Sequence, residues 1–108
     1  MAIAVGVHSS AASGGATSIT TTGVTTTSGS TIVLFAHWGT ETFSSIADSK
    51  GNTWTIIGAE LNASSHRSRA YYCANVTGGA SHTFTLTLST SGAPSIYMCE
   101  FTGAATSS

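Results

Sequence analysis

The chain has 108 residues, the length of a single domain, with 41% hydrophobic residues, 6% charged residues and a formal net charge of −1. Three basic residues cannot neutralise a row of phosphates or attract an anionic membrane surface, so nucleic-acid binding and membrane association are not expected. No apolar run approaches the ~20 residues of a transmembrane helix, which argues against membrane insertion. A surface of Ser, Thr, Asn and Gly suits an extracellular or virion protein and neutral partners such as glycans.

Taken in chain order, the sequence contains about eight strand-like runs and no long helical periodicity. Gly, Ser, Asn or Pro separates one run from the next, and Thr, Val, Ile, Tyr and Trp within them favour strands. The runs centre on residues 2–7, 17–24, 31–38, 43–47, 53–59, 68–75, 82–88 and 95–102. Short strands at regular spacing predict an all-β fold, an antiparallel β-sandwich of jelly-roll type that occupies residues 1–108 as one domain.

Three of these runs carry further information about their positions. The Thr-rich run 17–24 has few apolar anchors, which predicts an edge strand. In "STIVLFAHW" both parities are apolar from Ile32 to Ala36, which predicts a central strand covered on both faces, or one face at an interface. In "SHTFTLTLS", His82, Phe84, Leu86 and Leu88 alternate with threonines, which predicts one face on the core and one in water.

The end of the third run, "HWGTE", has two interpretations. It is either a strand end that continues into a loop, or a binding rim. In a rim, Trp38 would stack on the apolar face of a sugar while His37 and Glu41 would bind its hydroxyl groups.

The stretch "SIADSKGNTWTII" joins two runs through the turn formers Asp48–Asn52, with the only lysine of the chain, Lys50, at its tip. A β-hairpin loop is the simpler interpretation, since Asp48 and Asn52 cap turns and Gly51 permits a positive φ. The alternative, a Ca²⁺ site, lacks the series of acidic ligands of a dedicated calcium loop. Trp54, which follows the turn, either pins the hairpin to the core or contacts a ligand.

In the run "HRSRAYYC", Tyr71 and Tyr72 point to opposite faces, so one is expected in the core and the other at the surface. Arg67 beside an exposed Tyr72 is a plausible recognition pair and is also compatible with an ordinary solvated edge. The four histidines have no metal-ligand spacing, so we predict no metal and no cofactor.

Catalytic signatures are weak in this sequence. Glu41, Glu60 and Glu100 could contain a glycosidase pair, and Glu100 lies in an apolar strand, but the chain is short for a glycosidase cleft. We therefore predict that the protein is not an enzyme. Cys73 and Cys99 lie in two strands rich in apolar residues, and the sequence leaves open whether they form a disulfide or two buried thiols.

Four quoted segments resemble a known type of domain: "GSTIVLFAHWG", "SIADSKGNTWT", "RAYYCANVTGGASHTFTLTLS" and "IYMCEFTGA". They are similar, in the same order, to a Gly/Ser/Thr-rich β-sandwich domain of phage structural and bacterial secreted proteins, and they cover most of residues 29–104. The resemblance implies a binding or structural role and no catalytic residues. Similar sandwiches serve as carbohydrate-binding modules, which is an analogy at the level of fold.

The sequence thus predicts a non-catalytic extracellular or virion-associated module that recognises a neutral glycan or polysaccharide. The expected contacts are Trp38, Trp54, Tyr72, Arg67, His37 and Glu41. The alternative is a phage virion structural or decoration protein that acts through subunit contacts. Because charged residues that would keep chains apart are scarce, we also expect a homo-oligomer or a place in a larger assembly.

Overall fold

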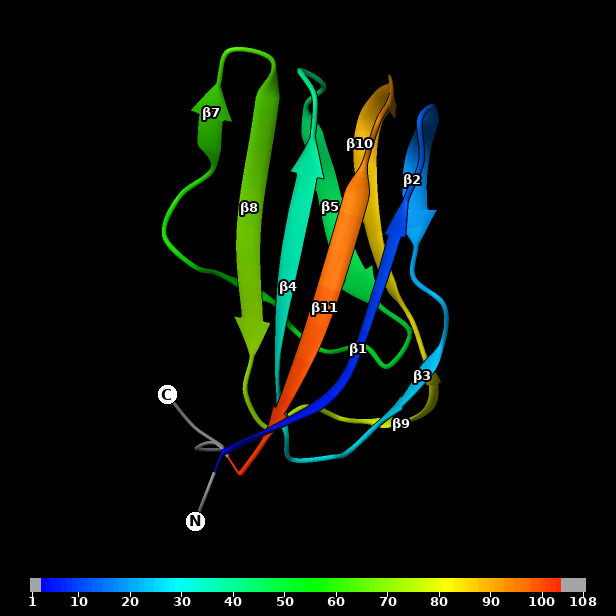
Figure 1. Cartoon of the computed structure of the whole chain (residues 1–108), viewed down its shortest axis with the longest axis vertical. Helices are drawn as coiled ribbons and strands as arrows, with labels where there is room; N and C mark the ends of the chain where they lie inside the picture. Colours follow the sequence, from blue (N-terminus) through cyan, green and yellow to red (C-terminus); the bar gives the residue numbers. More distant parts are fainter. Residues whose placement is uncertain (1–2, 104–108) are drawn as a thin grey trace.

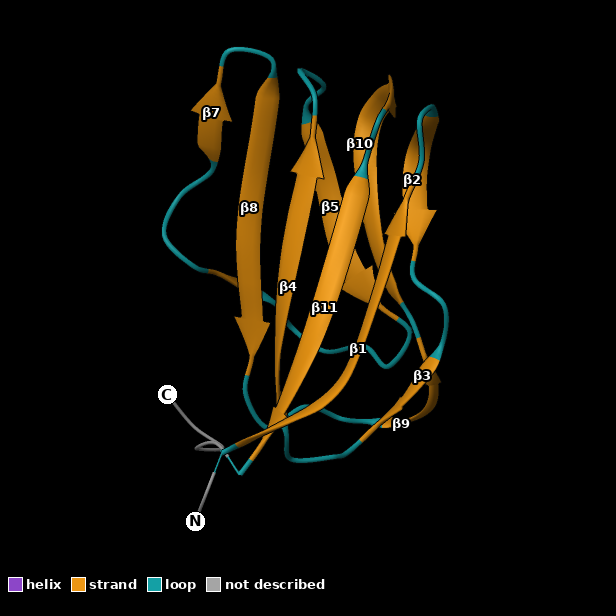
Figure 2. Ribbon diagram, in the orientation of Figure 1, coloured by secondary structure: helices purple, strands orange, loops and turns teal. Residues whose placement is uncertain are grey.

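A computed structural model describes residues 3–103, which form two main antiparallel sheets packed face to face and a short two-stranded sheet, without a helix in that range (Figures 1 and 2). The fold is the all-β sandwich that the sequence predicts. Eleven strands occur in the described range: β1 (Ala4–Ala12), β2 (Ala16–Thr20), β3 (Val24–Thr26), β4 (Thr31–Trp38), β5 (Phe43–Asp48), β6 (Thr55–Ile56), β7 (Leu61–Ala63), β8 (His66–Cys73), β9 (Gly79–His82), β10 (Phe84–Gly92) and β11 (Ser95–Thr102). No helix of the described residues is long and apolar enough to cross a membrane.

The strand pairs are nested along the chain. β1 pairs with β11, β2 with β10, β3 with β9 and β4 with β8, so the chain runs as one long two-stranded ribbon that doubles back on itself. The pairs β4–β11 and β5–β10 then join neighbouring turns of the ribbon. The larger sheet has the order β1-β11-β4-β8-β6, with β7 also on β8, and the smaller sheet has the order β2-β10-β5. This winding is that of a jelly roll.

The short β3–β9 pair lies where the ribbon passes from one sheet to the other, at the lower right of Figure 1. The sequence alone did not identify β3, β7 and β9, each of which has only three or four residues. These three strands explain why the described residues contain eleven strands where the sequence predicts about eight. Run 53–59 also contains only the two-residue β6, because Gly58 breaks the strand at a φ of 71°.

The core lies between the two sheets and follows the predicted alternation. On β10, Phe84, Leu86 and Leu88 are buried, and His82 just before them is fully buried as well. The larger sheet contributes the inward residues of its central strands, among them Ile32, Leu34, Ala36, Trp38, Ile96 and Met98. β2 lies at the edge of the smaller sheet, which confirms the prediction for the Thr-rich run.

The central strand β4 is buried on only one of its faces. Its even-numbered residues point into the core, whereas Phe35 on the other parity is 51% exposed. On the adjacent strand β11, Tyr97 lies directly opposite Phe35 and is 42% exposed. The predicted cover on both faces of β4 is therefore wrong within the described residues. The alternative, that one face of β4 lies at an interface, stays a prediction.

Cys73 and Cys99 are free thiols, which settles the question that the sequence left open. They lie on β8 and β11, which are separated by β4, and two strand spacings amount to about 9–10 Å. They also have opposite parity, since Cys73 faces Ile32 and Cys99 faces Val33 on β4. A disulfide requires Cα atoms within about 7 Å, so this geometry excludes the bond.

Candidate functional site

Trp38 does not lie on a binding rim. Its side chain is fully buried at the end of β4, where its ring lies 5.8 Å from that of Phe43, and its indole N–H donates to the Glu41 carbonyl at 2.8 Å. A side chain without solvent exposure cannot stack on a sugar. The prediction of Trp38 as a ligand contact is therefore corrected: the residue closes the end of the core.

Glu41 and Arg67 meet at the same end of the sandwich as Trp38. The Arg67 guanidinium donates to the Glu41 carbonyl at 3.5 Å. The Glu41 carboxylate folds back over the Cα atoms of Gly39 and Gly92, and its Oε1 is buried without a hydrogen-bond partner among the described residues. Both side chains are partly buried, so they frame this end of the molecule and do not project from it.

His37 and Tyr72 lie on the outer face of the larger sheet, because they have the parity opposite to that of the core residues. His37 is exposed and stacks on His66, with 5.1 Å between the ring centroids. Tyr72 is half-buried and faces Val33 across the β4–β8 pair. The six predicted contacts are thus divided between the core, one end of the sandwich and this outer face.

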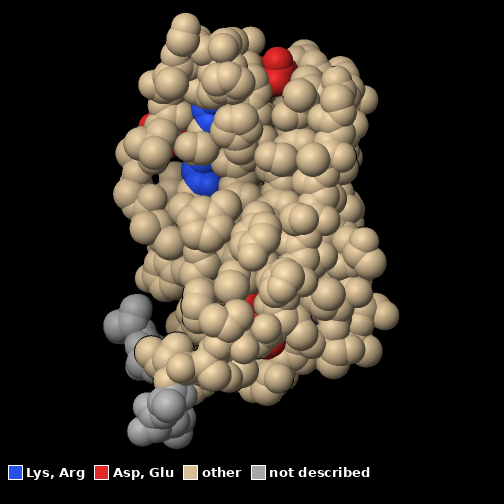
Figure 3. Space-filling model, in the orientation of Figure 1, with Lys and Arg blue, Asp and Glu red and all other residues tan. Residues whose placement is uncertain are grey.

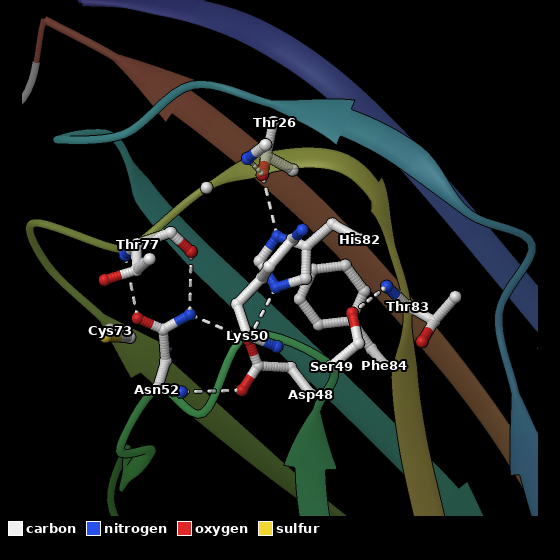
Figure 4. Close-up of polar contacts among 12 residues, drawn as sticks. Thr26, Asp48, Ser49, Lys50, Asn52, Cys73, Thr77, His82, Thr83 and Phe84 are labelled. Atoms are coloured by element: carbon white, nitrogen blue, oxygen red, sulfur yellow. Dashed lines mark hydrogen bonds and ion pairs between the residues drawn. The ribbon is translucent and has the colours of Figure 1, made fainter.

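Trp54, the sixth predicted contact, belongs to a buried polar cluster around Asp48. Figure 4 shows Thr26, Asp48, Asn52 and His82 of this cluster. Its ring packs edge-on against Phe84 at 5.9 Å, and its indole N–H donates to Asp48 Oδ1 at 3.2 Å. The residue thus pins the segment after the turn to the core. We refer to Thr26, Asp48, Asn52, Trp54 and His82 as the Asp48 network.

Asp48 is the centre of this network and accepts hydrogen bonds at both carboxylate oxygens. Asn52 donates its backbone N–H to Oδ1 at 2.9 Å and its side-chain amide to Oδ2 at 2.7 Å. His82 donates Nε2–H to Oδ2 at 2.5 Å. Burial disfavours the charged carboxylate, but the hydrogen bonds from Asn52, His82 and Trp54 outweigh it, so the pKa of Asp48 lies below its ordinary value of 3.8.

The turn also connects to two other parts of the chain. Asn52 exchanges two hydrogen bonds with the backbone of Thr77, at 2.9 and 3.1 Å. His82 reaches β3 through Thr26 Oγ1, 2.7 Å from its Nδ1, and Thr26 in turn accepts the Gly79 N–H at 3.2 Å. The imidazole tautomer with its proton on Nε2 satisfies all of these contacts. The turn is therefore a structural joint between β5, the loop after β8 and the β3–β9 corner.

A carboxylate, an imidazole and a hydroxyl in a row are also the groups of a nucleophilic triad. Here the imidazole of His82 is fully buried and Thr26 is only 4% exposed, so no substrate can reach the hydroxyl. Cation binding is not supported either, because both Asp48 oxygens already accept hydrogen bonds from N–H donors. Among residues 3–103 no group of three or more His, Cys, Asp or Glu side chains could hold a metal ion.

Glu41 and Glu100, two of the three glutamates weighed as a glycosidase pair, lie at opposite ends of β4. Glu100 faces Ile32 at the start of β4, and Glu41 follows the end of the same strand. The two ends of β4, at Ile32 and Trp38, are six residues apart, which corresponds to about 20 Å along the strand. This distance is well beyond the ~5–9.5 Å between the two carboxyl groups of a glycosidase. Glu100 is buried and accepts the Thr27 N–H and the Ser30 hydroxyl, each at 2.7 Å, while Glu60 binds Arg69 at 2.8 Å.

A half-open hollow lies on the outer face of the larger sheet. Its volume is about 560 Å³, and its lining runs from β1 across β11, β4 and β8 to residues 57–61. Phe35, Ala70 and Tyr97 belong to its floor on three adjacent strands, and Ile57 and Leu61 border it beyond β8. We refer to these five residues and the hollow between them as the outer groove.

The two aromatic rings of the outer groove are partly exposed neighbours. The centroids of Phe35 and Tyr97 are 6.5 Å apart, and the ring planes are tilted by 47°. His8 stacks on Tyr97 at 6.2 Å. Ile57 and Leu61 are 47% and 69% exposed, so the border of the groove is apolar as well.

Few charges surround the groove. Figure 3 shows the outer face of the larger sheet as largely uncharged, and the visible Lys and Arg atoms gather over β8. Arg69 belongs to the lining and is neutralised by its ion pair with Glu60. Hydroxyl groups of Ser10, Ser68 and Ser95 also line the hollow.

Phe35 and Tyr97 were missed as candidate contacts from sequence. The available signal was the apolar character of both parities in "STIVLFAHW" and "PSIYMCEF". Because either parity could face the core, the sequence did not show which aromatic residues would be exposed. The interpretation of "HWGTE" as a binding rim required an exposed Trp38, whereas Trp38 faces the core.

Searches for relatives returned no match: no protein-family model, no curated protein and no solved structure is similar to this chain.

Proposed function

We propose that the protein is a non-catalytic, extracellular or virion-associated module that binds a neutral glycan in the outer groove. The observation that supports this best is the pair of exposed aromatic rings, Phe35 and Tyr97, on the floor of an uncharged hollow of about 560 Å³. Aromatic faces stack on the apolar face of a sugar ring, and convergent polar groups orient its hydroxyls. Ser10, Ser68 and Ser95 are such groups.

Of the contacts expected from the sequence, His37 fits this proposal best because it lines the groove. Tyr72 lies on the same face, one row further along the strands. Arg67 and Glu41 stay at the sandwich end and have at most a supporting role. The separation of Glu41 from Glu100 supports a role without catalysis, and the resemblance to phage and secreted sandwich domains fits the expected location.

Substitution of the two rings tests the proposal. On a glycan array and in solution titrations of any glycan that binds, Tyr97→Ala and Phe35→Ala should each weaken binding at least tenfold. Val5→Ala is the matched control, because Val5 is an apolar residue of the same sheet, 65% exposed and outside the groove. Full binding by both aromatic variants, with Val5→Ala also unchanged, would contradict a site in the outer groove.

The alternative is a subunit contact of a virion-type assembly through the same face. It is favoured by a specific observation: Ile57 and Leu61 extend the apolar surface beyond the two rings, and they are 47% and 69% exposed. Large exposed apolar patches commonly mark protein interfaces. Analytical ultracentrifugation separates the two functions, because a subunit contact predicts assembly that Leu61→Asp abolishes. A glycan module predicts a monomer whose binding survives dilution.

A further inference from the structure

The rim of the outer groove holds two histidines that stack on each other, His37 of β4 and His66 of β8. Their ring centroids are 5.1 Å apart and their planes differ by only 23°. Both side chains are exposed. The two imidazole rings therefore lie side by side at the surface. We refer to these two residues as the histidine pair.

Two arginines follow His66 along β8, Arg67 beside the backbone of Glu41 and Arg69 beside the carboxylate of Glu60. Glu60 is bound to Arg69 at 2.8 Å, whereas Arg67 reaches only the backbone carbonyl of Glu41. The two ion pairs within residues 3–103 do not involve the histidine pair. Protonation of both rings would therefore add positive charge without a carboxylate placed to receive it.

The neighbours of His37 within the sheet are uncharged hydroxyl residues. Ser68 of β8 and Ser95 of β11 face it on either side, and both line the groove. The hydroxyl of Ser95 donates to the His37 carbonyl at 3.4 Å. Ser95 therefore uses its only hydroxyl hydrogen within the sheet, and Ser68 is the neighbour whose hydroxyl can donate to an anionic oxygen without adding charge once the imidazoles carry protons.

We infer that the histidine pair is an acid-dependent binding site for a carboxylate or sulfate group at the rim of the outer groove. Imidazole is the side chain that changes charge between about pH 5 and pH 8. Two protonated rings at this spacing repel each other, and an anion that accepts from both relieves the repulsion through charge-assisted hydrogen bonds. Binding of the anion is therefore linked to proton uptake. For each proton taken up, the affinity for the anion rises by up to about tenfold per unit decrease in pH.

For the ligand as a whole, this inference rests on the proposed glycan function: at low pH the groove would accept a sugar chain with uronate or sulfate substituents as well as a neutral one. The anion site itself is independent of the sugar. It can therefore be tested with an inorganic anion, and its failure can be distinguished from failure of the glycan proposal.

The test is a sulfate titration of the full chain, followed through the imidazole ¹H–¹⁵N signals at about pH 5.5 and about pH 8, with chloride keeping the ionic strength constant. Sulfate should shift the signals of His37 and His66 and bind at least tenfold more tightly at the lower pH. His66→Gln should remove this binding. His8→Gln is the matched control, because His8 lies on the same face but stacks on Tyr97 and has no second imidazole beside it.

Equal sulfate affinity at the two pH values would overturn the inference, and so would a His66→Gln variant that binds like the wild type. An equal loss in His8→Gln would reveal a general charge effect and would also overturn it. A second titration compares a uronate oligosaccharide with its neutral counterpart. If sulfate binds the histidine pair but neither sugar binds, the anion site stands and the glycan function fails.

Discussion

Replacement of Asp48 by alanine should show how much of the stability depends on the Asp48 network. The substitution removes the acceptor of His82 Nε2–H and Trp54 Nε1–H, and of two donors of Asn52. A buried donor left without an acceptor costs about 1–3 kcal/mol, so the His82 and Trp54 donors alone predict a loss of about 2–6 kcal/mol. Domains of this kind have total stabilities of about 5–15 kcal/mol, so the variant should be close to unfolding.

The assay is equilibrium unfolding in urea. The free energies of unfolding of the wild type and the variant are compared after checking that both depend on urea concentration with the same slope. Ser49→Ala is the control from the same turn: Ser49 is exposed and accepts one backbone bond, from Thr83 at 3.0 Å. It should lose less than about 1 kcal/mol. If Asp48→Ala also lost less than about 1 kcal/mol, the network would not stabilise the joint and the reasoning would be refuted.

Three further outcomes follow from the same structure. The pKa of Asp48 in the folded protein lies below 3.8, so the contribution of its charge to stability is present above that value and is lost as the pH falls through the folded pKa. The difference in unfolding free energy between the wild type and Asp48→Asn should therefore shrink only in that acidic range. Trp38→Ala should cost about 3–5 kcal/mol in thermal or urea unfolding, whereas an unchanged stability would contradict its burial. Burial and the nearby Asp48 charge raise the pKa of the Cys73 thiol, so iodoacetamide should alkylate it more slowly in the native than in the unfolded chain; equal rates would contradict this.

The fold could be predicted from sequence because alternation and turn residues are local signals. β10 shows this most clearly, since its threonines and its apolar residues separate onto two faces by parity alone. The ribbon order could not be derived in the same way. β1 and β11 pair across almost the whole chain, and nothing local in either strand identifies its partner.

The site was harder to predict because β4 has two apolar parities. Trp38 shares its parity with Ile32 and Leu34, and Phe35 shares its parity with Val33. Either set could have packed on the core. Which set is buried depends on which face of the larger sheet the smaller sheet covers, and the sequence of β4 does not show this. The Asp48–His82 contact was out of reach for a similar reason: 34 residues separate the partners, and each alone has an ordinary local explanation as a turn cap or a core residue.

The Asp48 network and the outer groove are connected through Trp54, which leads to the last prediction. Trp54 anchors the start of the segment that pairs with β8, and this segment ends with the Ile57 N–H bonded to the Ala70 carbonyl at 2.7 Å. Ile57 borders the groove, so Trp54→Ala should loosen that border more than it loosens the core. In native-state hydrogen exchange, the protection of the Ile57 amide should fall by more than that of Leu34 on the central strand. An equal fall at both amides would mean that Trp54 stabilises the sandwich as a whole and that the groove border depends on it no more than any other part.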